Sequence, residues 1–443
     1  MLRSNSLLIS CIVALSCLLS LAQATDDWMS TYDSGNGRDD AVAVTIDQEG
    51  SVYVLGNTTD DDDRPTIVVL KRSESGATQW DYAFERREDD ENVRAVGFVR
   101  DASSGTIYVA GVCERPDLGK EFLVFKLADG GQNVTRAWVC TWGTADANDD
   151  DVPSGIAIGP LDGNGAQFVA VAGTSWPGND PGEFSLLSLY PNGDTIGRGF
   201  WSWHMGSSRP NPRDSATAVA IAGIGYPGRI YVTGKSLHFP DPQGQPEDFY
   251  NVYYTYCFFA DGDASPWSIE ALYDGGSFRV ADALPIRISC SASHVVVSGT
   301  YSSYRDERSE SLLTVAYELD GQPTTWHEDR FGIGDASDPR DVSLVDLVNN
   351  VFSDEFYLTA RTDAPDSELA VLYYSSGLVP EKVRFLAHEG ELAAAAFGYR
   401  DYASDYEDGV YVAGECGDTS RISGRPRASS FGRPFGDAVF YRV

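Results

Sequence analysis

The amino-acid sequence predicts an all-β fold made of seven similar four-stranded antiparallel units. The first observation is a phrase at residues 39–58, DDAVAVTIDQEGSVYVLGNT, which indicates two short strands joined by a glycine turn. The second is that this phrase returns at intervals of about 60 residues along the chain. The third is that no segment shows the apolar spacing of a long helix. Four antiparallel strands repeated at this interval predict a seven-bladed β-propeller.

Each copy of the unit has the same four parts in the same order. In the first copy, strands are expected at 41–46 and 51–55, and Gly56 ends the second of them. An alternating strand follows at 66–71, and a strand with Trp80 completes the unit. The glycine recurs at the positions Gly111, Gly173, Gly234, Gly299 and Gly414, with Ala360 in its place in the sixth copy. Later third strands are expected at 121–127, 183–190, 249–258, 311–319, 368–374 and 437–443, and fourth strands at Trp138 or Trp142, Trp201 or Trp203, Trp267 and Trp326.

The two ends of the chain predict how the ring closes. The last copy reaches only its third strand, and residues 27–32, DWMSTY, form a tryptophan-bearing strand with no unit before it. We expect this strand to pair with the last copy and to complete the seventh blade. Closure of this kind leaves no open sheet edge at the seam.

The first copy also carries a family resemblance. Its residues resemble the repeat of the seven-bladed β-propeller repeat family of secreted, mostly bacterial proteins, at Asp40-Ala41, Ile46, Asp47, Gly50, Tyr53-Val54, Gly56 and Thr58. The resemblance covers nearly all of the chain after residue 24 and is clearest in copies one, two and four. It implies the fold and brings no common activity with it. Kelch and WD repeats fit less well, because the glycine pair of the first and the Gly-His and Trp-Asp signatures of the second are absent.

The first 24 residues have the pattern of a secretory signal peptide. Arg3 precedes an apolar run at 7–21, and Ala22-Gln23-Ala24 supplies the small-residue cleavage site. We therefore expect residues 25–443 to form one propeller domain that is secreted, periplasmic or displayed on the cell surface. A retained signal anchor is the alternative; no later segment is apolar enough to cross a bilayer.

Charge and cysteine content limit the partners and the chemistry. The formal net charge of −33 argues against nucleic acid and anionic membranes and favours cations or basic partners. We expect a monomer. The five cysteines after residue 24 are odd in number and widely spaced, which excludes a disulfide scaffold and a zinc cluster of CxxC type. One pair is compatible with an oxidising compartment, and the sequence does not say which of Cys113, Cys140, Cys257, Cys290 and Cys416 it joins.

The candidate binding residues lie in the loops that follow the glycine strands and in those between the units. These loops are long, at 175–182, 236–248, 301–309 and 416–436, and loops on a rigid scaffold carry variable function. Aromatic side chains gather there and suit sugar rings or protein hot spots, or else they cover the tops of the blades. The candidates are Trp176, Trp203, His204, His238, Phe239, Tyr301, Tyr304 and Arg305. Arg425 and Arg427 add a basic loop that either binds a ligand or pairs with the acidic run at 60–63.

A candidate metal site comes from acidic residues that precede the first strands. These are Asp40, Asp90, Asp151, Asp214, Asp282 and Asp341. If the first strands line a central channel, the carboxylates ring its mouth, and Ca²⁺ prefers such oxygen ligands. The alternative is a turn residue that accepts hydrogen bonds from nearby backbone. No cofactor other than Ca²⁺ is suggested.

Catalytic motifs are missing from the sequence. It contains no GxSxG and no HExxH, and the GxGxxG match at Gly223–Gly228 joins two strands of one unit, as a hairpin turn does. The favoured function is a binding module for an extracellular glycan or protein. The alternative is an extracellular hydrolase or lyase that uses a cation at the acidic channel mouth, and a purely structural matrix protein comes third.

Overall fold

The computed structural model describes most of the chain after residue 28. The described residues are 29–32, 34, 39–60, 62, 64–87, 90–143, 150–176, 182–203, 214–223, 225–238, 250–262, 264–269, 280–303, 310–319, 323–327, 342–350, 355–362, 368–374, 380–387, 391–402, 405–416 and 437–442. Within these ranges the regular structure consists of strands β1 to β28 and includes no helix. None of this described part therefore forms a helix that is long and apolar enough to cross a membrane.

The strands form seven four-stranded sheets, which we number sheet 1 to sheet 7 along the chain. Sheet 1 holds β2 (Asp40–Ile46), β3 (Val52–Thr59), β4 (Pro65–Arg72) and β5 (Thr78–Ala83); sheet 2 holds β6 (Asn92–Arg100), β7 (Ile107–Arg115), β8 (Gly119–Asp129) and β9 (Val134–Trp142). Sheet 3 holds β10 (Asp150–Pro160), β11 (Gln167–Trp176), β12 (Glu183–Leu189) and β13 (Thr195–Trp203); sheet 4 holds β14 (Ser215–Ile221), β15 (Arg229–His238), β16 (Tyr250–Phe259) and β17 (Ala264–Ile269).

The remaining sheets follow the same order. Sheet 5 holds β18 (Val280–Cys290), β19 (His294–Ser303), β20 (Glu310–Glu318) and β21 (Pro323–His327); sheet 6 holds β22 (Val342–Asn350), β23 (Glu355–Thr362), β24 (Glu368–Tyr374) and β25 (Pro380–Ala387). Sheet 7 holds β26 (Glu391–Tyr402), β27 (Asp405–Cys416), β28 (Asp437–Arg442) and β1 (Met29–Tyr32), so its fourth strand comes from the other end of the chain. β1 pairs antiparallel with β28, from Met29 opposite Tyr441 to Tyr32 opposite Ala438.

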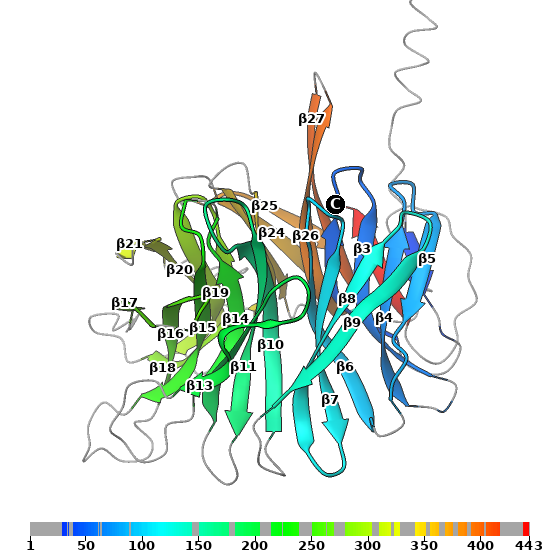
Figure 1. The fold of residues 1–443 in the computed structure, drawn as a ribbon. Coiled ribbons are helices and arrows are strands. Elements are labelled where there is room, and N and C mark those ends of the chain that lie inside the picture. Colours follow the sequence, from blue (N-terminus) through cyan, green and yellow to red (C-terminus); the bar gives the residue numbers. More distant parts are fainter. Residues whose placement is uncertain are drawn as a thin grey trace, which may run out of the picture.

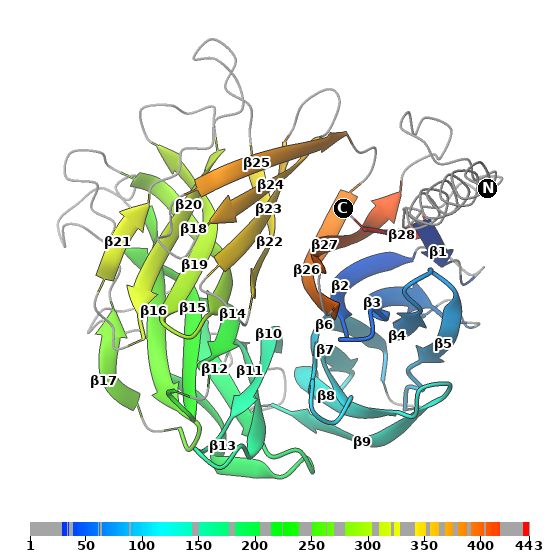
Figure 2. The ribbon, with the colours of Figure 1, turned by 90° about the horizontal axis from the view of Figure 1, so that it is seen from above.

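All pairings inside the sheets are antiparallel between neighbours, as the repeat predicts. The first strand of each sheet contacts the first strand of the next, and β2 of sheet 1 also contacts β26 of sheet 7. Figure 2 shows the sheets following one another with their first strands inward. Four-stranded antiparallel sheets arranged in this way are the blades of a β-propeller. The all-β prediction and the four-strand unit are therefore confirmed.

Because the strands of each sheet alternate in direction, their connections lie at two opposite edges of the sheets. We call the edge where first strands begin and second strands end the loop face, and the edge with the turns between strands one and two and between three and four the hairpin face. The β26–β27 hairpin extends beyond the other sheets on the hairpin face (Figure 1).

The core lies between neighbouring sheets, so the central strands are apolar on both sides. In β3, Tyr53 and Leu55 pack toward sheet 2, while Val52 and Val54 pack in a separate cluster with Tyr32 of sheet 7. All four β3 residues are at most 1% exposed. Burial on both faces explains why this segment reads as a continuous apolar run.

The recurring glycine lies opposite a β-bulge in the first strand. In sheet 1 the register shifts between Ala41 and Ala43, opposite Gly56, and the same shift recurs opposite Ala360, the alanine of the sixth copy. The bulge brings a backbone carbonyl close to the glycine. A Cβ atom at Gly56 would lie 2.9 Å from the Asp40 carbonyl oxygen, and one at Gly111 would lie 2.5 Å from that of Arg94. The glycine therefore serves the close approach of two strands rather than chemistry.

Candidate functional site

Trp176 is the predicted binding residue whose side chain the structure describes. It ends β11 on the loop face and is 37% exposed. The strands place Trp203, His238 and Tyr301 by backbone alone, at the loop-face ends of β13 and β15 and near the end of β19. The other predicted residues lie outside the described ranges; they are His204, Phe239, Tyr304, Arg305, Arg425 and Arg427.

An ion pair lies on the loop face at the junction of sheets 2 and 3, while the Trp176 indole lies toward sheet 4: a Cβ atom at Gly182 would lie 2.9 Å from both Trp176 Nε1 and the Asp214 carbonyl oxygen. Asp150, the first residue of β10, is directly opposite Trp176 in the strand register. Its carboxylate accepts hydrogen bonds from the Lys120 ammonium at 2.9 Å and from the Lys120 backbone N–H at 3.2 Å. The hydrogen bond to Asp150 raises the pKa of Lys120. Leu118, 41% exposed, lies two residues before Lys120 in the turn between β7 and β8.

We call these four residues, Leu118, Lys120, Asp150 and Trp176, the loop-face patch. It presents two apolar side chains and one ion pair whose partners are 39% and 42% exposed. An indole offers an apolar face to a sugar ring, while the ion pair supplies a donor and an acceptor for hydroxyl groups. The patch therefore has the chemistry of a binding surface.

The residues that follow Lys120 in β8 and Asp150 in β10 carry like charges rather than opposite ones. Glu121 of β8 and Asp151 of β10 are both acidic, and both border Gly143: a Cβ atom there would lie 2.9 Å from Asp151 Oδ2 and 3.1 Å from Glu121 Cγ. Arg115 forms an ion pair with Glu121 and donates to Thr141 at 2.6 Å. Burial raises the pKa of Glu121, and the charges of Asp151 and Asp90 raise it further against the opposing effect of Arg115. The structure thus brings two predicted aspartates together around a glutamate.

Sequence reasoning missed Glu121, Arg115, Lys120, Asp150 and Leu118 as members of a site. A signal for Glu121 was present, because an acidic residue occupies the equivalent position of the third strand in three other copies, at Glu183, Glu368 and Asp437. Each of these residues lies opposite the position two after the recurring glycine or alanine. The signal was hidden because only the pairing register shows that the positions are equivalent.

Three of the recurring aspartates are buried at or just before the start of their first strands. Asp90, Asp151 and Asp214 are 3%, 1% and 1% exposed. Asp90 accepts from the Cys113 thiol at 3.0 Å and from the Arg87 backbone N–H at 2.9 Å. Buried carboxylates need such donors, because a desolvated charge without hydrogen bonds is costly. Asp282 is placed by the backbone of β18 only, and Asp341 lies outside the described residues.

Sheet 1 corrects one assignment within this set. The buried position belongs to Asp39, which is 1% exposed, and not to its neighbour Asp40, which is partly exposed and pairs with Asn57. Asp39 accepts from the Thr58 hydroxyl at 2.6 Å and from the Ser34 backbone N–H at 2.9 Å. Successive residues of a strand face opposite sides, so only one of two adjacent aspartates can take the inward place.

A metal centre does not emerge from the described part of the chain. Within it, no three His, Cys, Asp or Glu side chains gather closely enough to hold a metal ion. Asp39 and Asp90 bond instead to a hydroxyl, a thiol and backbone donors within and just before their own sheets. Among the predicted aspartates, Asp90 accepts a hydrogen bond from nearby backbone, as the turn-residue alternative expects.

Cys113 is a hydrogen-bond donor rather than a nucleophile. Its thiol is fully buried in sheet 2 and is held against Asp90. Burial first, and then the hydrogen bond to Asp90, raise the pKa of Cys113 to about 12. A thiol of this kind stays protonated near neutral pH, and the thiolate is the reactive form.

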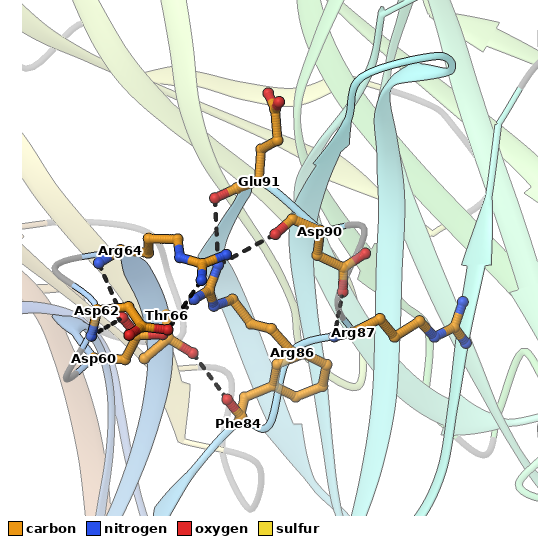
Figure 3. A network of polar contacts seen from close by, with 9 residues as sticks. All are labelled: Asp60, Asp62, Arg64, Thr66, Phe84, Arg86, Arg87, Asp90 and Glu91. Atoms are coloured by element: carbon orange, nitrogen blue, oxygen red, sulfur yellow. Dashed lines mark hydrogen bonds and ion pairs between the residues drawn. The ribbon is translucent and has the colours of Figure 1, made fainter.

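Asp60 and Asp62, the two described residues of the acidic run at 60–63, form ion pairs with nearby arginines. Figure 3 shows Arg86, from the link between sheets 1 and 2, reaching Asp60. Arg86 also donates to the carbonyl oxygens of Asp90 at 3.2 Å and Glu91 at 3.4 Å, while Arg64 pairs with Asp62 at 2.9 Å. These contacts join the sheet 1 loop to the start of sheet 2. The expected pairing of the run with Arg425 and Arg427 stays a prediction, because both lie outside the described ranges.

Comparison with known proteins gives no family and only distant structural likeness. No family model matches the chain, and no curated protein matches it. Among solved structures, a catalytically inactive virginiamycin B lyase from Staphylococcus aureus with quinupristin is similar at 10% identity and a TM-score of 0.44, over 94% of this chain and 99% of that one. The β-propeller domain of the Trilobed protease from Pyrococcus furiosus gives 10% and 0.43 over 86% and 92%. An ancestral GH74 enzyme gives 10% and 0.45 over 88% of this chain and 46% of that one. At these values the likenesses carry no argument about function.

Proposed function

We propose that the seven sheets are the blades of one seven-bladed β-propeller, with sheet 7 completed by β1. The support is the succession of contacts between first strands, including that of β2 with β26, and the pairing of β1 with β28. We also propose that the chain is related to the seven-bladed β-propeller repeat family, which its repeat resembles.

The function that fits this scaffold best is a binding module outside the cell, secreted or displayed on the surface, for a glycan or protein ligand. The observation that supports it is the exposed Trp176 on the loop face, where the Lys120–Asp150 ion pair also lies. A net charge of −33 disfavours anionic polymers, so the ligand class is a neutral or basic glycan or a basic protein segment. Aromatic side chains with a charged neighbour are frequent centres of binding energy.

The test uses a matched pair of aromatic variants. Residues 25–443 are applied to a glycan array, and the ligands found are titrated against Trp176→Ala and Tyr190→Ala. Tyr190 is 40% exposed but lies in the turn between β12 and β13, on the hairpin face. We expect Trp176→Ala to lose most of the affinity and Tyr190→Ala to keep it. The proposal is contradicted if neither a glycan of the array nor a basic peptide binds the protein. It is also contradicted if both variants lose affinity equally.

The second candidate is an extracellular hydrolase or lyase. It is favoured by Glu121, whose raised pKa suits a general acid and which lies beside Asp151 and Arg115. Turnover of an array ligand that Glu121→Gln abolishes would support the enzyme, and binding without turnover contradicts it. A Ca²⁺ titration of the melting temperature tests the cation: a ligand that binds the folded state raises this temperature, so no shift contradicts a Ca²⁺ site.

A further inference from the structure

Two cysteines from neighbouring sheets meet in one buried cluster. Cys257 lies in β16, the third strand of sheet 4, and Cys290 ends β18, the first strand of sheet 5. Cys257 is 1% exposed and belongs to the hydrophobic cluster between these sheets, and Cys290 packs against the same cluster. β16 and β18 also contact each other. Both sulfur atoms are in the reduced state in the structure.

The strand register shows which way Cys257 faces. It lies directly opposite Tyr231 of β15, so the two side chains share one face of sheet 4. The Tyr231 hydroxyl donates to the carbonyl oxygen of Leu319 in sheet 5 at 2.9 Å. Cys257 therefore faces sheet 5, the sheet that carries Cys290.

Tyr231 belongs to the same cluster as Cys257, and Cys290 packs against that cluster. Burial raises the pKa of Tyr231, and the neighbouring Cys257 and Cys290 raise it further. The pKa of Cys290 is itself raised, first by burial and then by Cys257. The two thiols and the phenol thus occupy one small region between the sheets.

The other described thiols are placed differently. Cys113 and Cys140 lie in β7 and β9 of sheet 2, on either side of β8. Two strand spacings separate their backbones by about 9–10 Å, and a disulfide needs Cα atoms within about 7 Å. Cys113 is also engaged with Asp90. Cys416 is placed by the backbone of β27, in sheet 7.

We propose that Cys257 and Cys290 form a disulfide bond that joins sheets 4 and 5 when the chain folds in an oxidising compartment. The thiolate of one cysteine attacks the disulfide of an exchange partner, a thiol–disulfide oxidoreductase or oxidised glutathione, and releases one thiol. The second cysteine then attacks the mixed disulfide and releases the other. Two protons leave the cysteines, one S–S bond forms, and the partner takes up the two electrons as two thiols. Because a thiolate is the attacking form and burial disfavours it, the exchange takes place while the two sheets dock.

The test is a map of the free and linked cysteines in the full chain, secreted with its own N-terminal segment. The protein is denatured in excess alkylating agent and digested without reduction. We expect one linked peptide pair that contains Cys257 and Cys290, with Cys113 and Cys140 alkylated. Alkylation of both Cys257 and Cys290, or a link from either one to another cysteine, overturns the proposal.

Single variants give an independent readout. In Cys257→Ala the partner Cys290 becomes alkylated, and in Cys290→Ala the partner Cys257 does. Reduction lowers the melting temperature of the wild-type protein by several degrees and leaves that of both variants unchanged. Cys140→Ala is the control, because it keeps both the linked pair and the response to reduction. An equal response to reduction in the wild type and in Cys257→Ala overturns the proposal.

Discussion

The hydroxyl of Tyr53 in sheet 1 donates a hydrogen bond of 2.7 Å to the carboxylate of Asp129 in sheet 2. Lys71 and the Trp80 indole N–H, both from sheet 1, bond to the same carboxylate at 2.8 and 3.1 Å. The tyrosine and tryptophan of the first copy therefore hold the next sheet. Sheet 2 contacts sheet 3 in a similar way, because Lys126 and Trp138 of sheet 2 donate to the Pro191 carbonyl oxygen of sheet 3 at 3.0 and 3.2 Å.

Removal of Asp129 should destabilise the junction of sheets 1 and 2. The Lys71 and Asp129 side chains are 8% and 5% exposed, and breaking a buried pair from one side costs about 3–5 kcal/mol. We expect Asp129→Ala to lower the denaturant midpoint strongly. Asp62→Ala, which removes the exposed partner of Arg64, should change stability by about 0–1 kcal/mol. Equal losses of stability in the two variants would show that the hydrogen bonds of Asp129 to Tyr53 and Lys71 do not stabilise the junction.

The same carboxylate should give the protein a defined acid sensitivity. Burial acts to raise the pKa of Asp129, but hydrogen bonds from Lys71, Tyr53 and the Gly131 N–H outweigh it and lower the pKa overall. A carboxyl whose folded-state pKa is lowered stabilises the protein above its unfolded-state pKa and loses this contribution as pH falls through the folded-state pKa. The gap in melting temperature between the wild type and Asp129→Asn should therefore narrow on acidification. A difference in melting temperature that does not change with pH contradicts the lowered pKa of Asp129.

Glu121 should show the opposite dependence on pH. Its folded-state pKa is raised, so its contribution is fully present at low pH and is lost as pH rises through that value. Glu121→Gln should melt at a higher temperature than the wild type near neutral pH, and the difference should shrink in acid. Thermal scans across this range measure it. A Glu121→Gln protein that is less stable at neutral pH would show that the Arg115 ion pair outweighs the cost of burying the Glu121 carboxylate and its repulsion from Asp151.

The bulge opposite Gly111 should make an alanine at this position destabilising. An alanine Cβ would lie 2.5 Å from the Arg94 carbonyl oxygen, which is backbone and cannot turn away. We expect Gly111→Ala to cost about 1–3 kcal/mol, the usual range for overpacking. Gly163→Ala is the matched control, because nothing lies within 4 Å of a Cβ at that turn. Comparable loss in both variants would point to chain flexibility as the cause.

The Cys113–Asp90 contact predicts a graded response at one buried position. Cys113→Ser keeps a donor for Asp90, whereas Cys113→Val fills the site without one. Leaving a buried acceptor unsatisfied costs about 1–3 kcal/mol, so the valine variant should be the less stable of the two in urea unfolding. If the valine variant is the more stable, the site is governed by apolar packing.

Much of the fold was predictable because its signals are local. Glycine turns, alternating strands and the repeated interval identified the four-stranded unit, and β2 to β5 lie within a few residues of the expected ranges. Trp80 and its counterparts Trp138, Trp267 and Trp326 do lie on the fourth strands. The contacts of Trp80 and Trp138 were not predictable, since they are made to Asp129 and Pro191, which belong to the following sheet.

The candidate site was predictable only in part. Asp90 and Asp151 were identified as recurring, yet their burial and their proximity to Glu121 depend on the register between strands. The choice between Asp39 and Asp40 turned on which of two identical neighbours faces inward, and the sequence does not distinguish them. Trp176 was identified from its loop, while its partners Lys120 and Asp150 come from two different sheets.

The pairing of β1 with β28 has a consequence for the order of assembly. During synthesis, sheets 1 to 6 can each form from contiguous chain, but sheet 7 needs Thr31 to meet Val439, from opposite ends of the sequence. Bringing distant segments together costs loop-closure entropy that rises slowly with length, and it delays folding more than it weakens the product. β1 therefore has no partner strand until β28 has been synthesised, so sheet 7 is completed after sheets 1 to 6 can form.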